Sequence, residues 1–251
     1  MLKIERRDAV MLLTLNRPEK RNALHPEMMR ELLTVLETIA TDETLNVVVL
    51  TGAGESFCAG LDLEQILSVP VEDKQENLGQ VFNIFQTIYT LPQPVIAAIN
   101  GPAIAGGFDL AQFCDLRLCV PSAVFGQAEI NLGLTQMMYP LYKTIGLSRA
   151  KELAMTGDVI SAAEAYRIGF INHIYPVEEM LGEALKLADK LAAKPRQALF
   201  ATKRLSRELI EVNSETAFKT MGAAIRESLN SEEHRLRLEK FLTTFKGQSK
   251  K

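Results

Sequence analysis

The segment Asn100–Asp109 carries the residues of this sequence with the clearest chemical potential. An apolar run, Pro94–Ile99, precedes it and predicts a buried strand, and Phe108–Phe113 predicts the start of a helix. Glycines between a strand and a helix let a ligand approach the backbone, and a helix N-terminus favours oxygen that gains negative charge. Asp109 would lie in the first helical turn beside that oxygen. This arrangement suits proton transfer next to a carbonyl group.

A structural role for Gly106 and Gly107 is the main alternative to this chemistry. Paired glycines are common between strands and helices in α/β proteins because the two elements must pack closely. A catalytic interpretation therefore requires a second backbone donor and a second proton carrier elsewhere in the chain.

Two further segments supply the missing groups. Residues 57–62 (Phe-Cys-Ala-Gly-Leu-Asp) follow a predicted strand over residues 47–50, and the backbone N–H of Leu61 is a candidate second donor. Residues 125–130 (Phe-Gly-Gln-Ala-Glu-Ile) follow another strand, and Glu129 is a candidate second proton carrier. Taken alone, Glu129 is better explained as a carboxylate at a helix start that complements the helix dipole.

Composition sets outer bounds on fold and location. A chain of 251 residues forms one large domain, or one domain with a helical appendage. The formal net charge of −3 shows no excess of basic residues, so nucleic acid is not an expected partner. The longest apolar run is too short to cross a bilayer, and no basic and then apolar leader precedes the first predicted strand. The three cysteines predict reduced, buried thiols, and we expect a cytoplasmic protein without membrane contact.

Several common catalytic motifs are absent or incomplete. Gly52-Ala-Gly54 follows a predicted strand, but Phe57 stands where a dinucleotide-binding fingerprint has its third glycine. Gly54–Cys58 lacks the closing glycine of a nucleophile elbow, and the sequence contains no Gly-Lys-Ser/Thr phosphate loop. The three histidines are scattered and there is no Cys-x-x-Cys pair, so we expect no metal and no covalent intermediate.

The predicted elements place these residues in an α/β arrangement. Short apolar runs predict strands at residues 2–6, 10–15, 47–50, 94–99 and 116–120. A helix is expected to begin at His25-Pro26, and residues 62–90 predict helices interrupted by a loop over 68–74. From about Leu141 the pattern is almost wholly helical, with a capping box at Ser161–Glu164.

The C-terminal part of the chain predicts amphipathic helices. Two apolar stripes recur at helical spacing, namely Phe218, Met221, Ile225 and Leu229, and then Leu238, Phe241, Leu242 and Phe245. Such stripes serve core or subunit contacts rather than a cofactor. We therefore divide the chain into a site-bearing core over residues 1–195 and a helical covering or assembly region over residues 196–251.

Together these segments resemble the crotonase family, also called the enoyl-CoA hydratase/isomerase superfamily. The resemblance covers nearly the whole chain, and its motifs follow one another in the family's order. They are Leu15-Asn-Arg-Pro18, Asn22-Ala-Leu24, Leu50-Thr-Gly52, Phe57-Cys-Ala-Gly60, Pro94–Gly101, Cys114-Asp-Leu-Arg117, Phe125-Gly-Gln127 and Thr156-Gly-Asp158. The resemblance implies an α/β fold with a spiral core of ββα units and a helical C-terminal region.

The resemblance also implies roles for individual residues. Leu61 and Gly106 match the two positions whose backbone N–H groups form the family's oxyanion hole, which stabilises a thioester enolate. Glu129 matches one of two glutamates with which the hydratases add water across the 2,3 double bond of an acyl-CoA. Asp109 stands at the other position, with roughly 1.5 Å less reach because it is one methylene shorter. The residues implied to border the substrate are Ala59, Asp62, Leu63 and Gly107.

Two features depart from the pattern of the hydratases. Some isomerases that act on dienoyl-CoA have an aspartate at the position of Asp109, but their additional acidic residue is matched here by Met137. The segment Leu134–Pro140 replaces a Pro/Gly-rich turn, and its bulky side chains would narrow the acyl pocket. The same segment is similar to that of isomerases which move a 3,4 double bond to the 2,3 position with a single glutamate at the Glu129 position.

The leading hypothesis is therefore hydration of an enoyl-CoA thioester, with Glu129 as the principal acid/base and Asp109 as its partner. The alternatives are double-bond isomerisation through Glu129 and a protein that binds acyl-CoA without catalysis. The resemblance implies no separate cofactor, because coenzyme A arrives as part of the substrate. It also implies a homotrimer or a dimer of trimers, with the helices after Ser214 at the interface.

Overall fold

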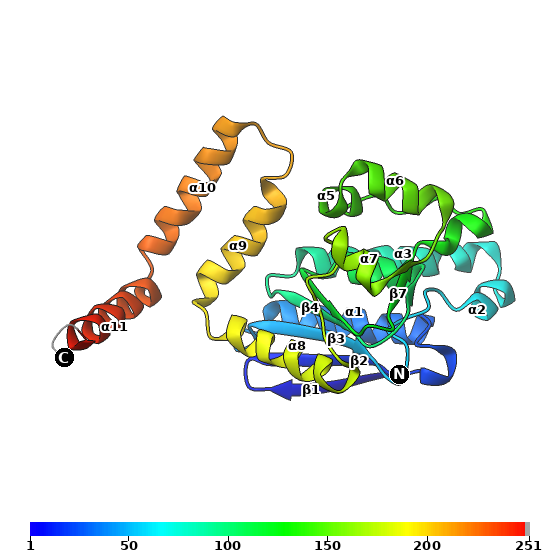
Figure 1. Cartoon of the computed structure of the whole chain (residues 1–251), viewed down its shortest axis with the longest axis horizontal. Coiled ribbons are helices and arrows are strands. Elements are labelled where there is room, and N and C mark those ends of the chain that lie inside the picture. Colours follow the sequence, from blue (N-terminus) through cyan, green and yellow to red (C-terminus); the bar gives the residue numbers. More distant parts are fainter. Residues whose placement is uncertain (249–251) are drawn as a thin grey trace. The chain divides into compact units, whose positions relative to one another are not determined.

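Two β-sheets organise the N-terminal part of the computed structural model (Figure 1). The structure describes residues 1–248, apart from the side chains of residues 71–74, 76, 77 and 244–248. Two compact units divide the chain, one over Met1–Lys190 and the other from Leu191 onward. The sequence analysis placed this boundary after residue 195.

The larger sheet has six strands in the order β1-β2-β3-β4-β6-β9. The strands are β1 (Leu2–Arg7), β2 (Val10–Leu15), β3 (Val47–Gly52), β4 (Val95–Ile99), β6 (Leu116–Cys119) and β9 (His173–Ile174). The first two pair antiparallel and all later neighbours pair parallel. Every residue of β3 and β4 is buried, as apolar runs in a parallel sheet covered on both faces require.

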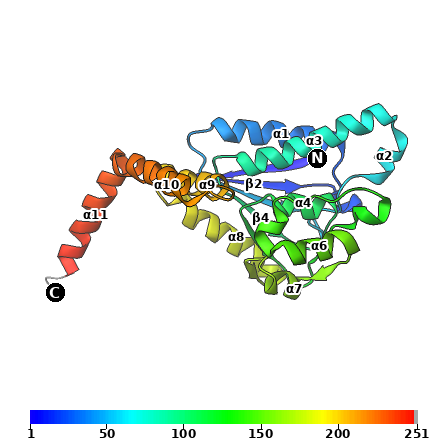
Figure 2. The same cartoon turned by 90° about the horizontal axis from the view of Figure 1, so that it is seen from above.

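Helices cover both faces of this sheet (Figure 2). The long helices α1 (Pro26–Thr41) and α3 (Val71–Thr90) lie side by side on one face, and α8 (Val177–Ala192) lies on the opposite side. The start of α1 agrees with the prediction, because His25 caps the helix by accepting a hydrogen bond from the Glu27 N–H at 3.3 Å.

A smaller sheet of three short strands lies next to the candidate site. Its strands, in spatial order, are β5 (Ala103–Ile104), β7 (Val124–Gly126) and β8 (Ile160–Ser161). An isolated bridge joins Cys58 to Ala103, so the segment before Leu61 pairs with the edge of β5. Helix α4 (Gly106–Gln112) begins two residues after β5 ends.

The structure corrects two of the predictions for secondary structure. Helices α2 (Leu63–Ser68) and α3 leave only residues 69 and 70 between them, so the loop expected over 68–74 is wrong. Pro70 directly precedes α3, where the absence of its N–H costs no helical hydrogen bond. The strands β8 and β9 interrupt the region predicted to be helical, because strands of two residues are too short to show alternation.

Three short helices follow β7; the first two lead from β7 to β8 within the small sheet, and the third leads from β8 to β9 in the large sheet. They are α5 (Leu141–Ile145), α6 (Leu147–Thr156) and α7 (Ala162–Arg167). The predicted cap of α7 is confirmed, because the Ser161 hydroxyl accepts a hydrogen bond from the Glu164 N–H at 3.2 Å.

Three helices make up the C-terminal unit. They are α9 (Arg196–Glu208), α10 (Ser214–Leu229) and α11 (Glu232–Gln248). The predicted stripe on α10 is helical, and Phe218, Ile225 and Leu229 are all exposed. The side chain of Phe245, in the second stripe, lies outside the described residues.

Two further predictions concern the cysteines and the length of the apolar helices. Cys58, Cys114 and Cys119 are buried and free, as predicted. Within the described residues, no helix combines the length and the apolarity needed to cross a membrane.

A buried asparagine holds the loop that follows β3. The Asn22 amide nitrogen donates to the carbonyls of Ala53 and Ser56 at 2.9 and 2.7 Å. Its amide oxygen accepts from the Arg17 N–H at 2.9 Å. Asn100 donates to the same Ser56 carbonyl at 3.2 Å. Side-chain amides therefore hold this loop in addition to backbone hydrogen bonds such as that from the Ala53 N–H to the Leu15 carbonyl at 2.8 Å.

We expect Asn22→Ala to lower the free energy of unfolding by about 3–5 kcal/mol. The substitution leaves the Arg17 N–H and the Ala53 carbonyl without the Asn22 amide and removes one of the two donors to the Ser56 carbonyl. It also places alanine at φ +56, in the left-handed region. Urea denaturation measures the change. Asn16→Ala is the control, since the half-buried Asn16 side chain makes no hydrogen bond within the described residues. A loss below about 1 kcal/mol for Asn22→Ala would contradict this account.

Candidate active site

The backbone N–H groups of Leu61 and Gly106 lie close together in the structure. A β-carbon built on Gly106 would lie 3.7 Å from the Leu61 nitrogen, and one built on Gly60 would lie 2.9 Å from the Gly106 nitrogen. Neither N–H donates a hydrogen bond to any group in the part of the chain that the structure describes. Unpaired backbone donors away from bulk water are costly, so these two groups favour an incoming acceptor oxygen.

Backbone strain at Ala105 aims the Gly106 N–H. Ala105 has φ 54° and ψ −129°, a conformation that residues with a side chain rarely adopt and that costs about 1–3 kcal/mol. A hydrogen bond from its N–H to the Gly126 carbonyl, at 2.8 Å, holds it in place. The pairing of β5 with β7 thus precedes a sharp turn into α4, and the first residue of that helix lies beside the Leu61 segment.

The Leu61 segment is held by a second set of backbone bonds. The Leu24 N–H donates to the Gly60 carbonyl at 2.7 Å, and the Asp62 N–H donates to the Leu24 carbonyl at 3.3 Å. These two bonds lie on either side of Leu61 and leave its own N–H directed away from Leu24.

Asp109 lies in the first turn of α4 and is only 4% exposed. Its Oδ1 accepts hydrogen bonds from the side-chain amides of Gln112, at 2.7 Å, and of Gln127, at 3.0 Å. Both glutamines are buried, and the amide oxygen of each has no partner within the described residues. An unpartnered buried acceptor costs about 1–3 kcal/mol, so the fold gives up stability to direct two donors at this carboxyl group.

Glu129 lies in a short 3-10 helix over Ala128–Leu132, directly after β7. It is half-buried, and it is close enough to Asp109 for the two charges to interact. In the amide orientation that satisfies both of its polar atoms, Gln136 donates to Glu129 Oε2 at 3.1 Å and accepts from the Glu129 N–H at 3.3 Å. The structure therefore brings together both carboxylates that the sequence analysis selected.

Burial and proximity weaken the acidity of both carboxyl groups. Burial first, and the charge of Glu129 second, raise the pKa of Asp109 to about 8, against the hydrogen bond from Gln127, which lowers it. Burial also raises the pKa of Glu129. Like charges at this depth disfavour double ionisation, so the pair retains a proton on the more buried Asp109 at neutral pH.

Asp62 and Gly107, two of the residues predicted to border the substrate, make close contacts within the protein. Asp62 caps α2, and its Oδ2 forms an ion pair with Arg17 at 3.0 Å. Burial alone would raise the pKa of Asp62, but the hydrogen bonds from Arg17 and from the Gln65 N–H lower it below its usual range. Gly107 has no space for a side chain, because an added β-carbon would lie 2.0 Å from the Cys58 carbonyl oxygen.

The remaining two predicted residues border the same segment. The Ala59 N–H donates to the Arg21 carbonyl at 3.0 Å, and Leu63 opens α2 with 53% of its surface exposed. Contact of these residues with substrate stays a prediction.

The segment 134–140 lies against the carboxyl pair. The Met137 carbonyl accepts a hydrogen bond from the Gln127 amide at 2.8 Å, and both Met137 and Met138 are half-buried. The Tyr139 hydroxyl lies 2.7 Å from that of Tyr89. This hydroxyl pair ties the segment to α3.

Three residues around the carboxyl groups were missed by the sequence analysis, namely Gln112, Gln127 and Gln136. Gln112 could have been found, since it lies three residues after Asp109 on one helix, a spacing at which side chains meet. Gln127 belongs to the Phe125-Gly-Gln127 motif, which could have marked it, whereas no local spacing marks Gln136.

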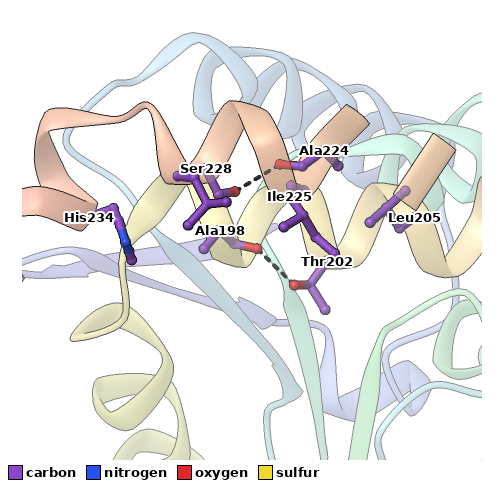
Figure 3. Close-up of a pocket in the computed structure, with 9 residues that line it drawn as sticks. Ala198, Thr202, Leu205, Ala224, Ile225, Ser228 and His234 are labelled. Carbon is purple, nitrogen blue, oxygen red and sulfur yellow. Dashed lines mark hydrogen bonds between the residues drawn. The ribbon is translucent and has the colours of Figure 1, made fainter. Parts of the chain in front are cut away.

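A pocket of about 260 Å³ lies within the C-terminal unit (Figure 3). Its lining residues include Ala198, Leu205, Ala224 and Ile225, and none of the predicted site residues. Thr202 donates its hydroxyl to the Ala198 carbonyl within its own helix, so this polar side chain offers the pocket no free donor (Figure 3). Among the described residues, no group of three or more His, Cys, Asp or Glu side chains is arranged to hold a metal ion.

Comparisons with known proteins agree with this architecture. The family model for enoyl-CoA hydratase/isomerase matches residues 5–250. A crotonyl-CoA hydratase from Syntrophomonas wolfei is 34% identical over 220 residues, which cover 85% of this chain and 84% of the relative. A short-chain-enoyl-CoA hydratase from Clostridium acetobutylicum is 32% identical over 237 residues, which cover 92% of this chain and 90% of the relative.

Solved structures lead to the same assignment. The crystal structure of an enoyl-CoA hydratase from Bacillus anthracis matches with a TM-score of 0.94 at 31% identity, over 97% of this chain and 96% of that one. The mixed α/β fold with a helical C-terminal region is thereby confirmed. The chain belongs to the enoyl-CoA hydratase/isomerase family.

We expect the Asp109 carboxyl group to be protonated at pH 7 and to ionise near pH 8. Its pKa in the unfolded chain is about 3.9, so the folded protein binds this proton more tightly. The contribution of this proton to the free energy of unfolding is fully present below about pH 4 and is lost as the pH rises through about 8. Between these values the free energy of unfolding should fall by at most about 1.4 kcal/mol per pH unit.

Infrared difference spectra between about pH 6 and pH 9 measure the carboxyl group directly. A protonated-carboxyl band should disappear on raising the pH, and Asp109→Asn should lack both this band and the corresponding slope in stability. A spectrum in which Asp109 is already ionised at pH 6 would contradict the assignment.

Proposed function

We propose that this chain adds water to the 2,3 double bond of an enoyl-CoA thioester. The observation that carries the proposal is that two unpaired backbone N–H groups, of Leu61 and Gly106, occur together with a buried Asp109 carboxyl group that interacts with Glu129. The hydratase names of the relatives support the same reaction.

The two N–H groups would accept the thioester oxygen. Charge develops on this oxygen as the enolate forms, and fixed donors in a site away from bulk water stabilise it without reorganisation. One such donor typically contributes about 3–4 kcal/mol to lowering the barrier. Backbone donors suit this task because the pairing of Leu24 and of β5 fixes their direction before substrate arrives.

The carboxyl pair would move the protons. The ionised Glu129 takes a proton from water as the water oxygen bonds to C3, and the protonated Asp109 gives its proton to C2. Water thus contributes hydroxyl to C3, C2 gains hydrogen, and the proton on Glu129 restores Asp109 for the next turnover. A single proton shared by two coupled groups is the state that this sequence of transfers requires.

Isomerisation is the alternative within enzymes, and the relatives do not favour it. An isomerase needs one carboxylate to carry a proton between two carbons, whereas this site keeps two interacting carboxyl groups and supports each with glutamine amides. Binding of acyl-CoA without turnover is disfavoured for the same reason.

We expect both Glu129→Gln and Asp109→Asn to lower kcat on crotonyl-CoA by at least about 100-fold, because each removes one proton carrier. The loss of enoyl-thioester absorbance measures turnover, and KM should change less. Glu37→Gln, which alters an exposed carboxylate on α1, is the control and should keep full activity.

Different outcomes separate the three activities. Conversion of a 3-enoyl-CoA without hydration of crotonyl-CoA would replace hydration by isomerisation. Binding of CoA esters with no turnover by the wild type would make the chain a binding protein. Full hydration by Glu129→Gln would remove that residue from the mechanism.

The proposal includes no separate cofactor, since coenzyme A is part of the substrate. We further propose a cytoplasmic homotrimer or dimer of trimers, assembled through the helices after Ser214. The support is the apolar surface of α10 and α11, where Phe218 is 73% and Phe241 is 64% exposed. Apolar side chains at such spacing are costly in water and typical of a subunit contact.

We expect light scattering to give three or six times the mass of the chain. Phe218→Asp should shift this mass towards the monomer, because it places a charge in the proposed contact. Lys219→Asp, at the next position of the same helix, is the matched control and should leave the assembly intact. A monomeric wild type would remove the assembly from the proposal.

A further inference from the structure

The two carboxyl groups of the site are both connected to one short segment, residues 134–140. Gln127 makes the first connection, because its amide nitrogen donates to Asp109 Oδ1 at 3.0 Å and to the Met137 carbonyl at 2.8 Å. One buried amide thus joins a carboxyl group on α4 to the backbone of the segment.

Gln136, within the segment itself, makes the second connection. Its amide nitrogen donates to Glu129 Oε2 at 3.1 Å. Its amide oxygen accepts from the backbone N–H of Glu129 at 3.3 Å and also from the N–H of Ile130. The same side chain therefore fixes both the backbone and the carboxyl group of Glu129.

The Gln127 amide nitrogen is held between the Asp109 carboxyl group and the backbone of segment 134–140. Gln127 is fully buried, and its amide oxygen has no partner within the described residues. A buried apolar side chain of the same length would leave no such unpaired atom. The feature to be explained is therefore one buried amide that is shared between a titrating carboxyl group and the backbone of segment 134–140.

We propose that Gln127 and Gln136 are positioning residues that fasten Asp109 and Glu129, respectively, to segment 134–140. The segment is therefore the common anchor of both proton carriers, in addition to any part it has in shaping the acyl pocket. This inference deepens the proposed hydration, and its effect on turnover rests on that function.

The anchoring has a specific consequence for Asp109. Its Oδ1 already accepts two amide hydrogens, from Gln112 and Gln127, so Oδ2 is the oxygen that carries the exchanged proton. A fixed Oδ2 suits a carboxylate whose side chain is short, because a misplacement of about 1 Å costs on the order of 100-fold in rate.

The first test replaces Gln127 by methionine, which keeps the length of the side chain and removes both donated hydrogen bonds. Loss of a donor to the ionised form raises the pKa of Asp109, so its infrared titration should move up by about one pH unit. On crotonyl-CoA, kcat should fall by about 10–100-fold with KM within about threefold, and the pH–rate limb of Asp109 should shift upward.

The second test uses Gln136→Met, at a half-buried position that tolerates substitution should Gln127→Met fail to fold. This variant should raise the pKa of Glu129 by a similar amount and reduce kcat comparably. The infrared band of Glu129 is assigned by its loss in Glu129→Gln. The titration of Asp109 should move less than in Gln127→Met, because its two amide donors remain.

Gln93→Met is the matched control for burial. Gln93 is as buried as Gln127, and its amide nitrogen donates to the Ile39 carbonyl at 2.7 Å, which belongs to α1. It should lose stability to a similar extent while leaving both carboxyl titrations and the pH–rate profile unchanged.

The outcomes distinguish this inference from the proposed function. If the wild type hydrates crotonyl-CoA but neither glutamine variant moves its carboxyl titration or lowers kcat more than Gln93→Met, the positioning roles are overturned and hydration stands. If the wild type has no hydratase activity but the titrations move as expected, the positioning roles stand and the reaction is wrong.

Discussion

A ladder of backbone pairing across three distant segments is the constraint on which the site depends. Cys58 pairs with Ala103, and Ala103 in turn pairs with Phe125 in the small sheet. These pairings bring the Leu61 segment, the start of α4 and the Glu129 turn side by side, although about 70 residues of chain separate the first from the last. Backbone hydrogen bonds are directional, so the ladder fixes direction as well as proximity. Donors and carboxyl groups are consequently placed by the main chain before any substrate arrives.

The same framework explains why the fold tolerates unfavourable features in one small region. Ala105 keeps a strained backbone, two glutamines keep unpartnered oxygens, and Asp109 is buried beside a second carboxyl group. Each lowers stability, and all three lie within the segments that the ladder joins. Strain and like-charge pairs persist only where the surroundings over-determine them, and they are typical of sites whose geometry is set for chemistry. The six-stranded sheet, with β3 and β4 wholly buried, supplies the compensating stability.

Strands formed by long apolar runs and helix starts marked by capping residues could be predicted from the sequence, whereas two-residue strands could not. Residues 94–99 predicted β4 because an apolar run between turn residues indicates a buried strand, and His25-Pro26 predicted the start of α1. By contrast, β8 and β9 have two residues each and exist only because partner strands are present. The loop predicted over residues 68–74 was wrong for a different reason. Pro70 directly precedes α3, and from the sequence a proline that opens a helix is hard to distinguish from one that ends it.

By itself, the sequence determined the types of the chemical groups and their order. Two carboxylates, two glycine-flanked backbone donors and the ordered motifs of the family are all present in the linear chain. Only the tertiary structure decided that the Leu61 and Gly106 N–H groups are unpaired neighbours, and that Gln127 and Gln136 attach the carboxyl groups to segment 134–140. The physical reason is that acidity and hydrogen bonding depend on burial and on distances of a few ångströms. Burial and interatomic distances are set when segments that are remote in the sequence pack together, so they cannot be predicted from the local residue types.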